Sequence, residues 1–541
     1  MHVALPLAAT GVAGASGPLR YLPLLRGSGA RGPLSSHLAP SGARGPLAIT
    51  ILAALAGGAL WGLCFAVQPW LPLCLVGLVP LFLLLGQPKA WLLGWLHGIA
   101  TWVVAMFWLL DTLTTYGAIE GWLAGLLLLG LGAFLGLYHA AFAALGGRLW
   151  RRGRLIDLAA LPALWVLLEV ARGLLFTGFP WNLAAYAWTD VPGALRLSAW
   201  IGAWGVSYLV VFVSLGIARG IATRRWQAAA FAVLLAAVCL AVGGRWAAGS
   251  DRAAGDPQSA VRRAIIVQPD TPNQVAFDPA RFESDYARLL ALTGDACRPG
   301  TLVLWPESAA WPMLYGRDPR LESDLAAFTA RGCSVLLNSA TPEGGEGKRY
   351  FNSALLVTPG LGVERYDKRH LVPFGEYVPL AGVFTFISSL ARNAGDFQPA
   401  TELRLLDWEG ERLGPAICYE VVFASEVAQL TRAGATVLVS MTNDAWYGDT
   451  AAPWQHLRAA RFRAAENHRF LLRAAITGVS AVVGPDGALR GSLGVGERGL
   501  LPALFQGRTD ITPFARAPWA VPALCLALLA VALGRLISSS A

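Results

Sequence analysis

The chain begins with a low-complexity stretch and then carries a series of long apolar runs separated by short polar loops. A membrane-spanning helix needs about 20 mostly apolar residues. The first two runs lie close together and predict a tight helical hairpin. The pattern predicts a polytopic α-helical membrane domain of about eight spans, at Leu47–Val67, Leu71–Leu85, Trp91–Leu113, Trp122–Leu145, Leu155–Phe176, Leu197–Ile221, Gln227–Val242 and Trp519–Ile537.

One long segment between the seventh and eighth apolar runs is polar. Within it, short runs rich in Val, Ile and Leu alternate with helix-like stretches, which predicts an open sheet covered by helices. The expected strands are Ala264–Val267, Leu302–Trp305, Val335–Asn338, Ser353–Val357, Leu413–Ile417, Thr436–Ser440 and Ser480–Val483. The expected helices are Pro279–Leu292, Asp318–Arg331, Glu420–Ala433 and Pro453–Leu471.

Charged loop residues predict how the chain crosses the membrane. Positive charge collects on alternate loops, in the N-terminal tail, at Lys89, at Arg148–Arg154 and at Arg219–Arg225, whereas the other loops carry Asp111, Glu120 and Asp190. Loops rich in Lys and Arg face the cytoplasm. The polar segment is therefore expected to be extracytoplasmic. The net charge of +9 does not suggest nucleic-acid binding, because no basic stripe with interleaved aromatics is present.

Composition agrees with a membrane protein and separates the tail from the rest. The chain is 55% hydrophobic and 14% charged, where a soluble protein has about 25% charged residues. The tail is rich in Gly, Pro, Ala and Ser and repeats one heptamer at 28–34 and 41–47. We expect a disordered low-complexity tail at 1–46, a seven-span membrane domain at 47–246, an extracytoplasmic α/β domain at 247–517 and a C-terminal transmembrane helix at 518–541.

Seven cysteines without a CxxC spacing suggest neither a disulfide scaffold nor a zinc site. Four of them lie in apolar runs and are expected to be packing residues: Cys64, Cys74, Cys239 and Cys525. Cys297 and Cys333 lie in the polar segment and could pair in an oxidising compartment, which the sequence leaves open. We expect no metal and no cofactor.

Three strand ends in the polar segment carry residues suited to acyl transfer. Glu307 follows the strand ending at Trp305, Lys368 lies in the segment Tyr366–Glu376, and Cys418 stands at a sharp strand-to-helix turn. A cysteine nucleophile needs a base, and the reaction needs donors where the oxyanion forms. Glu307 would be the base, Lys368 the oxyanion partner and Cys418 the nucleophile. On residue types alone, a chance grouping is the better explanation.

The motifs around these residues resemble the nitrilase (carbon–nitrogen hydrolase) superfamily. The shared motifs are Trp-Pro-Glu at 305–307, Tyr-Asp-Lys-x-x-Leu-Val-Pro-Phe-Gly-Glu at 366–376 and Ile-Cys-Tyr-Glu at 417–420. The stretches 371–380, 442–448, 169–181 and 204–207 resemble the apolipoprotein N-acyltransferase family in particular. The resemblance covers the chain from about Leu47 onward and implies a nitrilase-like αββα sandwich for the polar segment.

The resemblance also implies a reaction. Members of that family move an acyl chain from a phospholipid, typically phosphatidylethanolamine, onto the cysteine as a thioester. They then pass it to the α-amino group of the diacylglyceryl N-terminal cysteine of an apolipoprotein. The catalytic positions match Glu307, Lys368 and Cys418; Glu376 and Glu420 match supporting carboxylates, and Tyr419 and Trp446 match residues lining the substrate site. The implied location is the bacterial cytoplasmic (inner) membrane, with the catalytic domain on the periplasmic side.

Several alternatives stand beside this interpretation. A membrane-tethered amidase or nitrilase-type hydrolase would use the same triad and give the thioester to water. A transporter with a sensory domain would show two symmetric halves, and no such repeat is present. Glu376 could merely stabilise a loop, and Trp446 could merely anchor one at the membrane surface. A catalytic or metal role is not expected for three histidines: His370, His456 and His468.

Two further features have open interpretations. Glu169 and Arg172 lie three residues apart in an apolar run and could be a structural ion pair or the floor of a headgroup site. The stretch Tyr377–Ala391 is too apolar for a solvated loop and too short to span. It is predicted to be a membrane-facing lid; alternatively, Val383, Phe384, Phe386 and Ile387 pack into the core.

Overall fold

The computed structural model describes residues 47–68, 70–253, 260–273, 277–343, 349–360, 362–377 and 397–538. The predicted disordered tail, 1–46, lies outside the described residues. So does the predicted lid beyond Tyr377.

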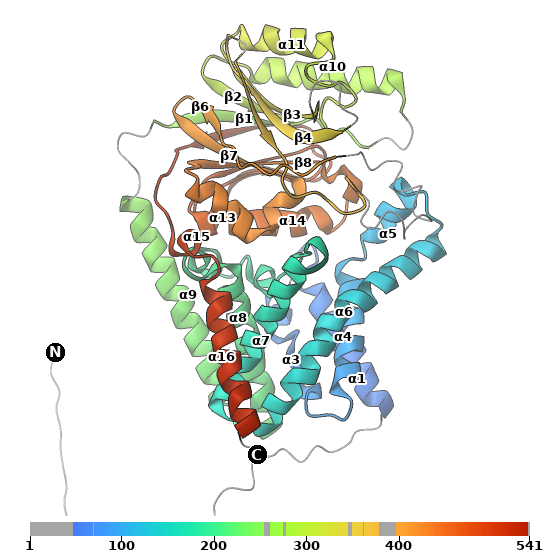
Figure 1. The fold of residues 1–541 in the computed structure, drawn as a ribbon, viewed down its shortest axis with the longest axis vertical. Coiled ribbons are helices and arrows are strands. Elements are labelled where there is room, and N and C mark those ends of the chain that lie inside the picture. The colour runs from blue at the N-terminus through green and yellow to red at the C-terminus, as the bar shows by residue number, and fades with distance from the viewer. Residues whose placement is uncertain are drawn as a thin grey trace, which may run out of the picture. The chain divides into compact units, whose positions relative to one another are not determined.

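The apolar helices form an elongated bundle beneath the β-sheets (Figure 1). Five described helices are long and apolar enough to cross a membrane: α6 (Gly121–Arg152), α7 with η2 (Leu155–Thr177), α8 (Ala194–Thr223), α9 (Gln227–Ala253, its apolar part Gln227–Arg245) and α16 (Ala520–Ser538). A sixth is possible if α4 (Ala90–Ala105) and the segment α5–η1 (Leu109–Tyr116), bent by 65°, make one span. The expected count of about eight is thus not confirmed by length and composition.

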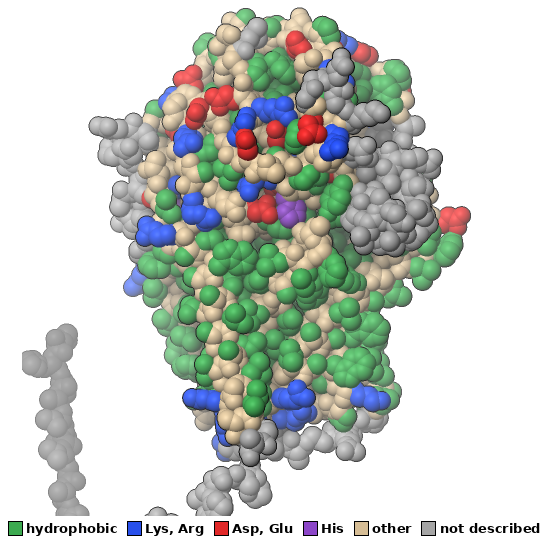
Figure 2. Space-filling view, in the orientation of Figure 1, with side chains coloured by type: hydrophobic (Ala, Val, Ile, Leu, Met, Phe, Trp, Pro, Cys, Tyr) green, Lys and Arg blue, Asp and Glu red, His purple; other side chains and the backbone are tan. Residues whose placement is uncertain are grey.

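The first two apolar runs of the chain form helices that are shorter than a membrane-spanning helix. The run expected at Leu71–Leu85 forms α2 (Leu71–Val76) and α3 (Val79–Leu84), and each of these begins with a proline in its first turn. Proline cannot donate a helical hydrogen bond, so it favours a new helix start. The helix α1 (Leu47–Leu63) has 17 residues. Large apolar side chains cover the outside of the bundle (Figure 2).

The polar segment folds into two six-stranded mixed sheets that pack face to face. The first has the order β12-β1-β2-β3-β4-β5 and the second β11-β10-β9-β8-β7-β6. Strand bounds are β1 Arg262–Gln268, β2 Thr301–Leu304, β3 Ser334–Pro342, β4 Tyr350–Val357, β5 Val363–Asp367, β6 Leu406–Trp408, β7 Glu411–Ile417, β8 Val437–Thr442, β9 Leu471–Ala475, β10 Ser480–Val483, β11 Leu489–Leu493 and β12 Gly499–Phe505. The expectation of one open sheet is therefore wrong, and the αββα sandwich implied by the resemblance is confirmed.

Helices cover both outer faces of this sandwich. The helices α10 (Pro279–Ala296) and α11 (Pro319–Thr329) lie on the first sheet, and α13 (Ala424–Arg432) and α14 (Ala452–Asn467) lie on the second, toward the apolar helices (Figure 1). Alternate residues of a strand face opposite sides. Ile266 of β1 accordingly packs between the sheets, whereas Ile265 and Val267 pack with the side chains of α10 and α11.

The seven expected strands are all present, but the expected helix Pro453–Leu471 is wrong at its end. The helix α14 stops at Asn467, and Leu471 already begins β9. His468 ends the helix with a positive φ of 53°. The strand β9 is buried on both faces, so its sequence shows no alternation that would distinguish it from a helix. The expected helix Glu420–Ala433 instead begins with a short 3-10 helix, η5 (Cys418–Val422).

One glycine allows the bundle and the sandwich to approach closely. Gly202 interrupts α8 with a φ of 65°, a conformation that side chains rarely adopt. An added Cβ there would lie 2.5 Å from the ring of Phe514. Phe514 belongs to α15 (Pro513–Arg516), which connects the sandwich to α16.

Candidate active site

Cys418 lies at the carboxyl end of β7, where parallel neighbouring strands end together. Its φ is 52°, in the left-handed region that non-glycine residues adopt at a cost of order 1–3 kcal/mol. The chain turns there at once into the 3-10 helix η5, so Cys418 sits in its first turn, where backbone N–H groups lack helical partners. The side chain is buried, with 8% exposed.

The side chain of Glu420 stabilises the turn at Cys418. Its carboxylate accepts hydrogen bonds from the backbone N–H of Ile417 at 2.8 Å, of Arg369 at 2.7 Å and of His370 at 3.2 Å. The Tyr366 hydroxyl donates to both of its oxygens, at 2.9 and 3.0 Å. Glu420 therefore connects the cysteine turn to the segment that carries Lys368. It therefore holds both segments in place through hydrogen bonds.

Lys368 and two glutamates form a buried charge cluster. Lys368 Nζ lies 2.9 Å from Glu376 Oε2 and 3.7 Å from Glu307 Oε1. All three side chains are buried, and Lys368 is fully so. Two carboxylates around one ammonium leave the group with a net negative charge, which is suited to accepting a proton.

The charges of this cluster shift the pKa values of Lys368 and of the Cys418 thiol. Burial alone would lower the pKa of Lys368, but the carboxylates of Glu376 and Glu307 outweigh it and hold that pKa above its ordinary value. Burial and the nearby Glu307 charge raise the pKa of the Cys418 thiol, and Lys368 offsets only part of this. The resting thiol is therefore neutral at pH 7, and it needs a base to remove its proton during attack.

A pair of asparagines, which the sequence motifs did not reveal, holds the glutamates. Asn352 Nδ2 donates to Glu307 Oε1 at 2.9 Å and to Glu376 Oε1 at 2.7 Å. Asn338 Nδ2 donates to Asn352 Oδ1 at 2.6 Å and so fixes the amide orientation. The backbone N–H of Asn443 donates to the other oxygen, Glu307 Oε2, at 2.9 Å. Glu307 is thus held from both sheets, whereas Glu376 is held by Asn352 of the first sheet.

A second polar group, also unexpected from the sequence, lies behind the cysteine. His456 Nε2 is 3.1 Å from the carbonyl oxygen of Cys418. Its Nδ1 is 3.1 Å from both Asp444 Oδ1 and Arg473 Nη2, and Arg473 also donates to Asp444 Oδ2 at 2.7 Å. The Arg473 guanidinium holds the pKa of Asp444 at about 2 despite its burial.

Tyr419 and Trp446, both expected to line the substrate site, contact the apolar bundle. The Tyr419 hydroxyl donates to the carbonyl oxygen of Gly178 at 3.0 Å, in the loop after α7. Trp446 is 40% exposed, and its ring meets Tyr116 edge-on at 5.3 Å between centroids. Its carbonyl oxygen accepts from Thr112 Oγ1 at 2.8 Å. Trp446 thus lies farther out than the triad, where the loop of η6 (Asp444–Tyr447) touches η1.

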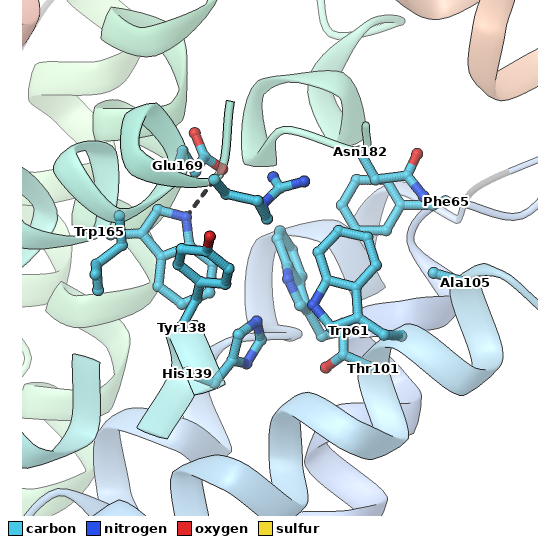
Figure 3. Close-up of a pocket in the computed structure, with 12 residues that line it drawn as sticks. Trp61, Phe65, Thr101, Ala105, Tyr138, His139, Trp165, Glu169 and Asn182 are labelled. Carbon is cyan, nitrogen blue, oxygen red and sulfur yellow. Dashed lines mark hydrogen bonds between the residues drawn. The ribbon is translucent and has the colours of Figure 1, made fainter. Parts of the chain in front are cut away.

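A cavity lies in the bundle next to the loop after α7 (Figure 3). Glu169 and Arg172 line it, but they do not pair with each other. Glu169 accepts from Trp165 Nε1 at 3.0 Å and from the backbone N–H of Ala184 at 2.7 Å. Arg172 donates to the carbonyl oxygens of Phe179 and Trp181, each at 2.6 Å. Both side chains therefore shape the loop that Tyr419 contacts. Of the two open interpretations, the ion pair is wrong.

Cys297 and Cys333, whose pairing the sequence left open, form a disulfide. Among the described residues, no three His, Cys, Asp or Glu side chains lie together in a way that could hold a metal ion.

Comparisons with known proteins agree with this architecture. Residues 57–216 match the family model "Apolipoprotein N-acyltransferase N-terminal domain", and residues 274–510 match "Carbon-nitrogen hydrolase". An apolipoprotein N-acyltransferase of Geobacter metallireducens is 34% identical over 455 residues, 81% of this chain and 86% of that protein. One of Ralstonia nicotianae is 35% identical over 484 residues, 86% and 89% of the two chains. A solved carbon–nitrogen hydrolase superfamily protein of Xanthomonas campestris is 20% identical, with 48% of this chain and 96% of that chain covered and a TM-score of 0.33.

The fold and the comparisons together define a bacterial membrane enzyme with a catalytic domain of the carbon–nitrogen hydrolase type. More specifically, the chain belongs to the apolipoprotein N-acyltransferase family. The membrane-tethered hydrolase is not favoured, because the relatives that match both halves of the chain are acyltransferases.

Proposed function

We propose that this enzyme forms an acyl thioester on Cys418 from a membrane phospholipid and transfers the acyl chain to the α-amino group of a lipidated N-terminal cysteine. The observation that supports this best is the joint position of the triad. Glu307, Lys368 and Cys418 share one buried charge environment, and Tyr419, next to the nucleophile, is hydrogen-bonded to the bundle. A hydrolase of soluble amides has no need for that contact.

In the first step Glu307 takes the thiol proton while the sulfur attacks the ester carbonyl. Lys368 stabilises the resulting oxyanion. The C–O bond then breaks, and the lysophospholipid leaves with the proton from Glu307. In the second step the acceptor amine attacks the thioester, Glu307 takes the amine proton, and Cys418 leaves as a thiol once that proton is returned.

The donor and the acceptor are assigned from the family, and the location rests on charge and on the helix ends. We assign phosphatidylethanolamine as donor, a diacylglyceryl-cysteine apolipoprotein as acceptor, and the inner membrane, with the sandwich on the periplasmic side. Arg151 and Arg152 lie in the last turn of α6 and Arg535 lies in the last turn of α16. Arg152 donates to the carbonyl oxygen of Arg535 at 3.4 Å. Figure 2 shows Lys and Arg side chains gathered at the end of the bundle that lies away from the sandwich. Loops rich in Lys and Arg face the cytoplasm. The Cys297–Cys333 disulfide supports an oxidising compartment.

The number of membrane spans and the domain limits are part of the same proposal. The chain would cross the membrane eight times, with α1 and the α2–α3 pair as a short hairpin, so that all Arg-rich helix ends lie on the cytoplasmic side. The divisions 47–246, 247–517 and 518–541 follow from them.

Purified enzyme mixed with phosphatidylethanolamine should gain the mass of one acyl chain on Cys418. Adding a diacylglyceryl peptide should then return the free thiol and yield N-acyl peptide in equal amount. Cys418→Ser should form no detectable adduct, because a hydroxyl is far harder to deprotonate than a thiol. Lys368→Ala should form it about 100- to 1000-fold more slowly, the cost of losing one oxyanion donor. Release of free fatty acid without acylated peptide would instead support the hydrolase. Near-normal transfer by Cys418→Ala would disprove the nucleophile assignment.

A further inference from the structure

The peptide unit between Cys418 and Tyr419 is contacted at its carbonyl by the side chain of His456. The carbonyl oxygen of Cys418 lies 3.1 Å from Nε2 of the His456 imidazole. A trans peptide is planar, so its C=O and N–H point in opposite directions. Whatever fixes the carbonyl therefore also aims the N–H of Tyr419. That N–H lies in the first turn of η5, where no helical acceptor is available to it.

The imidazole itself is held rigidly. Arg473 Nη2 and Asp444 Oδ1 each lie 3.1 Å from Nδ1, and the Thr442 hydroxyl donates to Asp444 Oδ1 at 2.8 Å. These four side chains are fully buried, with His456 at 1% exposed. A carbonyl oxygen can only accept, so Nε2 carries the proton that bonds Cys418.

His456 is therefore suited to orientation and not to proton removal. Burial and the Arg473 charge lower the pKa of His456, which keeps the ring neutral near pH 7. In that form Nδ1 accepts from Arg473 and Nε2–H donates to Cys418. The ring bonds the backbone of the nucleophile, and Glu307 remains available as base.

We propose that His456 is a positioning residue that orients the Cys418–Tyr419 peptide, so that the Tyr419 N–H stabilises the oxyanion formed during acylation of Cys418. This rests on the proposed function. When the sulfur–carbon bond forms, the carbonyl electron pair moves to oxygen, and the thiol proton goes to Glu307. The Tyr419 N–H and Lys368 share the new negative charge until the ester C–O bond breaks and the leaving alkoxide takes the proton.

Two substitutions separate orientation from packing. His456→Gln keeps an amide N–H at similar reach, whereas His456→Leu fills the space without a donor. We expect His456→Leu to lower the single-turnover rate of Cys418 acylation by phosphatidylethanolamine about 10- to 100-fold, because one oxyanion donor is worth about 100- to 1000-fold and is here misdirected, not removed. The lipid concentration at half-maximal rate should not change. His456→Gln should recover most of the rate.

Alkylation of Cys418 by iodoacetamide provides the decisive second measurement. Displacement at the iodoacetamide carbon forms no oxyanion, so His456→Leu should alkylate at the wild-type rate while acylating slowly. An equal loss of both rates would overturn the proposal, because it would mean that His456 supports the thiol itself. Undiminished acylation in His456→Leu would overturn it as well. If the leucine variant does not fold, His456→Asn, whose shorter amide falls short of the carbonyl, takes its place under the same criteria. Wild-type enzyme that alkylates but never acylates would refute the proposed function instead.

Discussion

Lys368 forms its closest ion pair with Glu376, at 2.9 Å between Nζ and Oε2, and not with the expected base. Glu307 is the more distant carboxylate, at 3.7 Å. An ammonium that binds a base tightly would reduce the basicity of that base. Glu376 therefore contacts Lys368 as well as the backbone of its own loop. In the proposed mechanism this contact would leave Glu307 free to accept the thiol proton.

Glu376→Gln should slow thioester formation by about 10- to 100-fold, the equivalent of one charge-assisted hydrogen bond. Without the second carboxylate, Lys368 is expected to move toward Glu307 and weaken it as a base. Glutamine still offers an oxygen to the backbone N–H of Val372, which Glu376 binds at 2.8 Å, so the loop should stay in place. Rapid-quench mass analysis of Cys418 measures the rate. Glu402→Gln, at an exposed surface pair, is the control and should acylate normally.

Asn352→Leu should also reduce acylation about 10-fold or more, and it should lower the melting temperature because two buried carboxylates lose a donor. Leucine has a similar volume, but it withdraws the N–H that Glu307 Oε1 and Glu376 Oε1 share. Charged acceptors lose about 1.5–3 kcal/mol when such a bond is removed. The same mass assay measures the loss, with the thermal midpoint recorded in parallel. An acylation rate equal to that of wild type would show that Asn352 serves the sheet and not the carboxylates.

The strands and the strand-end residues could be predicted from local sequence, whereas the residues that hold them could not. Short runs such as Leu302–Trp305 reveal a strand and place Glu307 just beyond it. Asn352 lies inside β4 and gains its role only because β3 and β4 pair beside β2. His456 lies on a helix, and nothing in its neighbourhood along the chain indicates that it meets the carbonyl of Cys418. Contacts of this kind depend on sheet order, which the sequence pattern does not specify.

The pH dependence of stability should contain a contribution from His456. Burial and Arg473 lower its pKa in the folded state, so the folded protein binds the proton less readily than the unfolded chain, whose value is about 6.5. The stabilisation is thus fully present above pH 6.5 and is lost as pH falls below it. The charge of Asp444, which also faces the ring, offsets only part of this lowering of the His456 pKa, and the pKa of Asp444 itself, held at about 2, lies outside this range. His456→Gln should flatten the fall in melting temperature between pH 6.5 and 5. Parallel curves for both proteins would contradict this.

Gln455 should stabilise the contact between sandwich and bundle. Its Nε2 donates to the carbonyl oxygens of Phe65 and Ala105, each at 2.9 Å. Its Oε1 accepts from Trp108 Nε1 at 3.2 Å and from Trp181 Nε1 at 2.7 Å. Gln455→Leu would leave four buried groups without this partner, at about 1–3 kcal/mol each when water cannot replace it. We expect the melting temperature in detergent to fall by several degrees.

The matched control for that substitution is Gln429→Leu. Gln429 accepts one hydrogen bond from Arg369, so its loss should cost about 1 kcal/mol. A shift no larger for Gln455→Leu than for Gln429→Leu would show that the contact does not depend on Gln455.

Reporter fusions should reveal how the chain crosses the membrane. A reporter active only outside the cytoplasm should be silent after Arg225 and active after Val261, because α9 lies between these points.

The short hairpin of α1, α2 and α3 is the sharper test, since each of these helices is below the length of an ordinary span. A fusion after Val67 should be active and one after Lys89 silent if the hairpin crosses and returns. The carbonyl of Val67 accepts from Arg458 of α14 at 2.8 Å, which supports its position on the side of the sandwich. A cytoplasm-dependent reporter at the same four points should give the opposite pattern. Silence after Val67 with activity after Val261 would mean that the first helices enter and leave on the cytoplasmic side, and the eight-span arrangement would then be wrong.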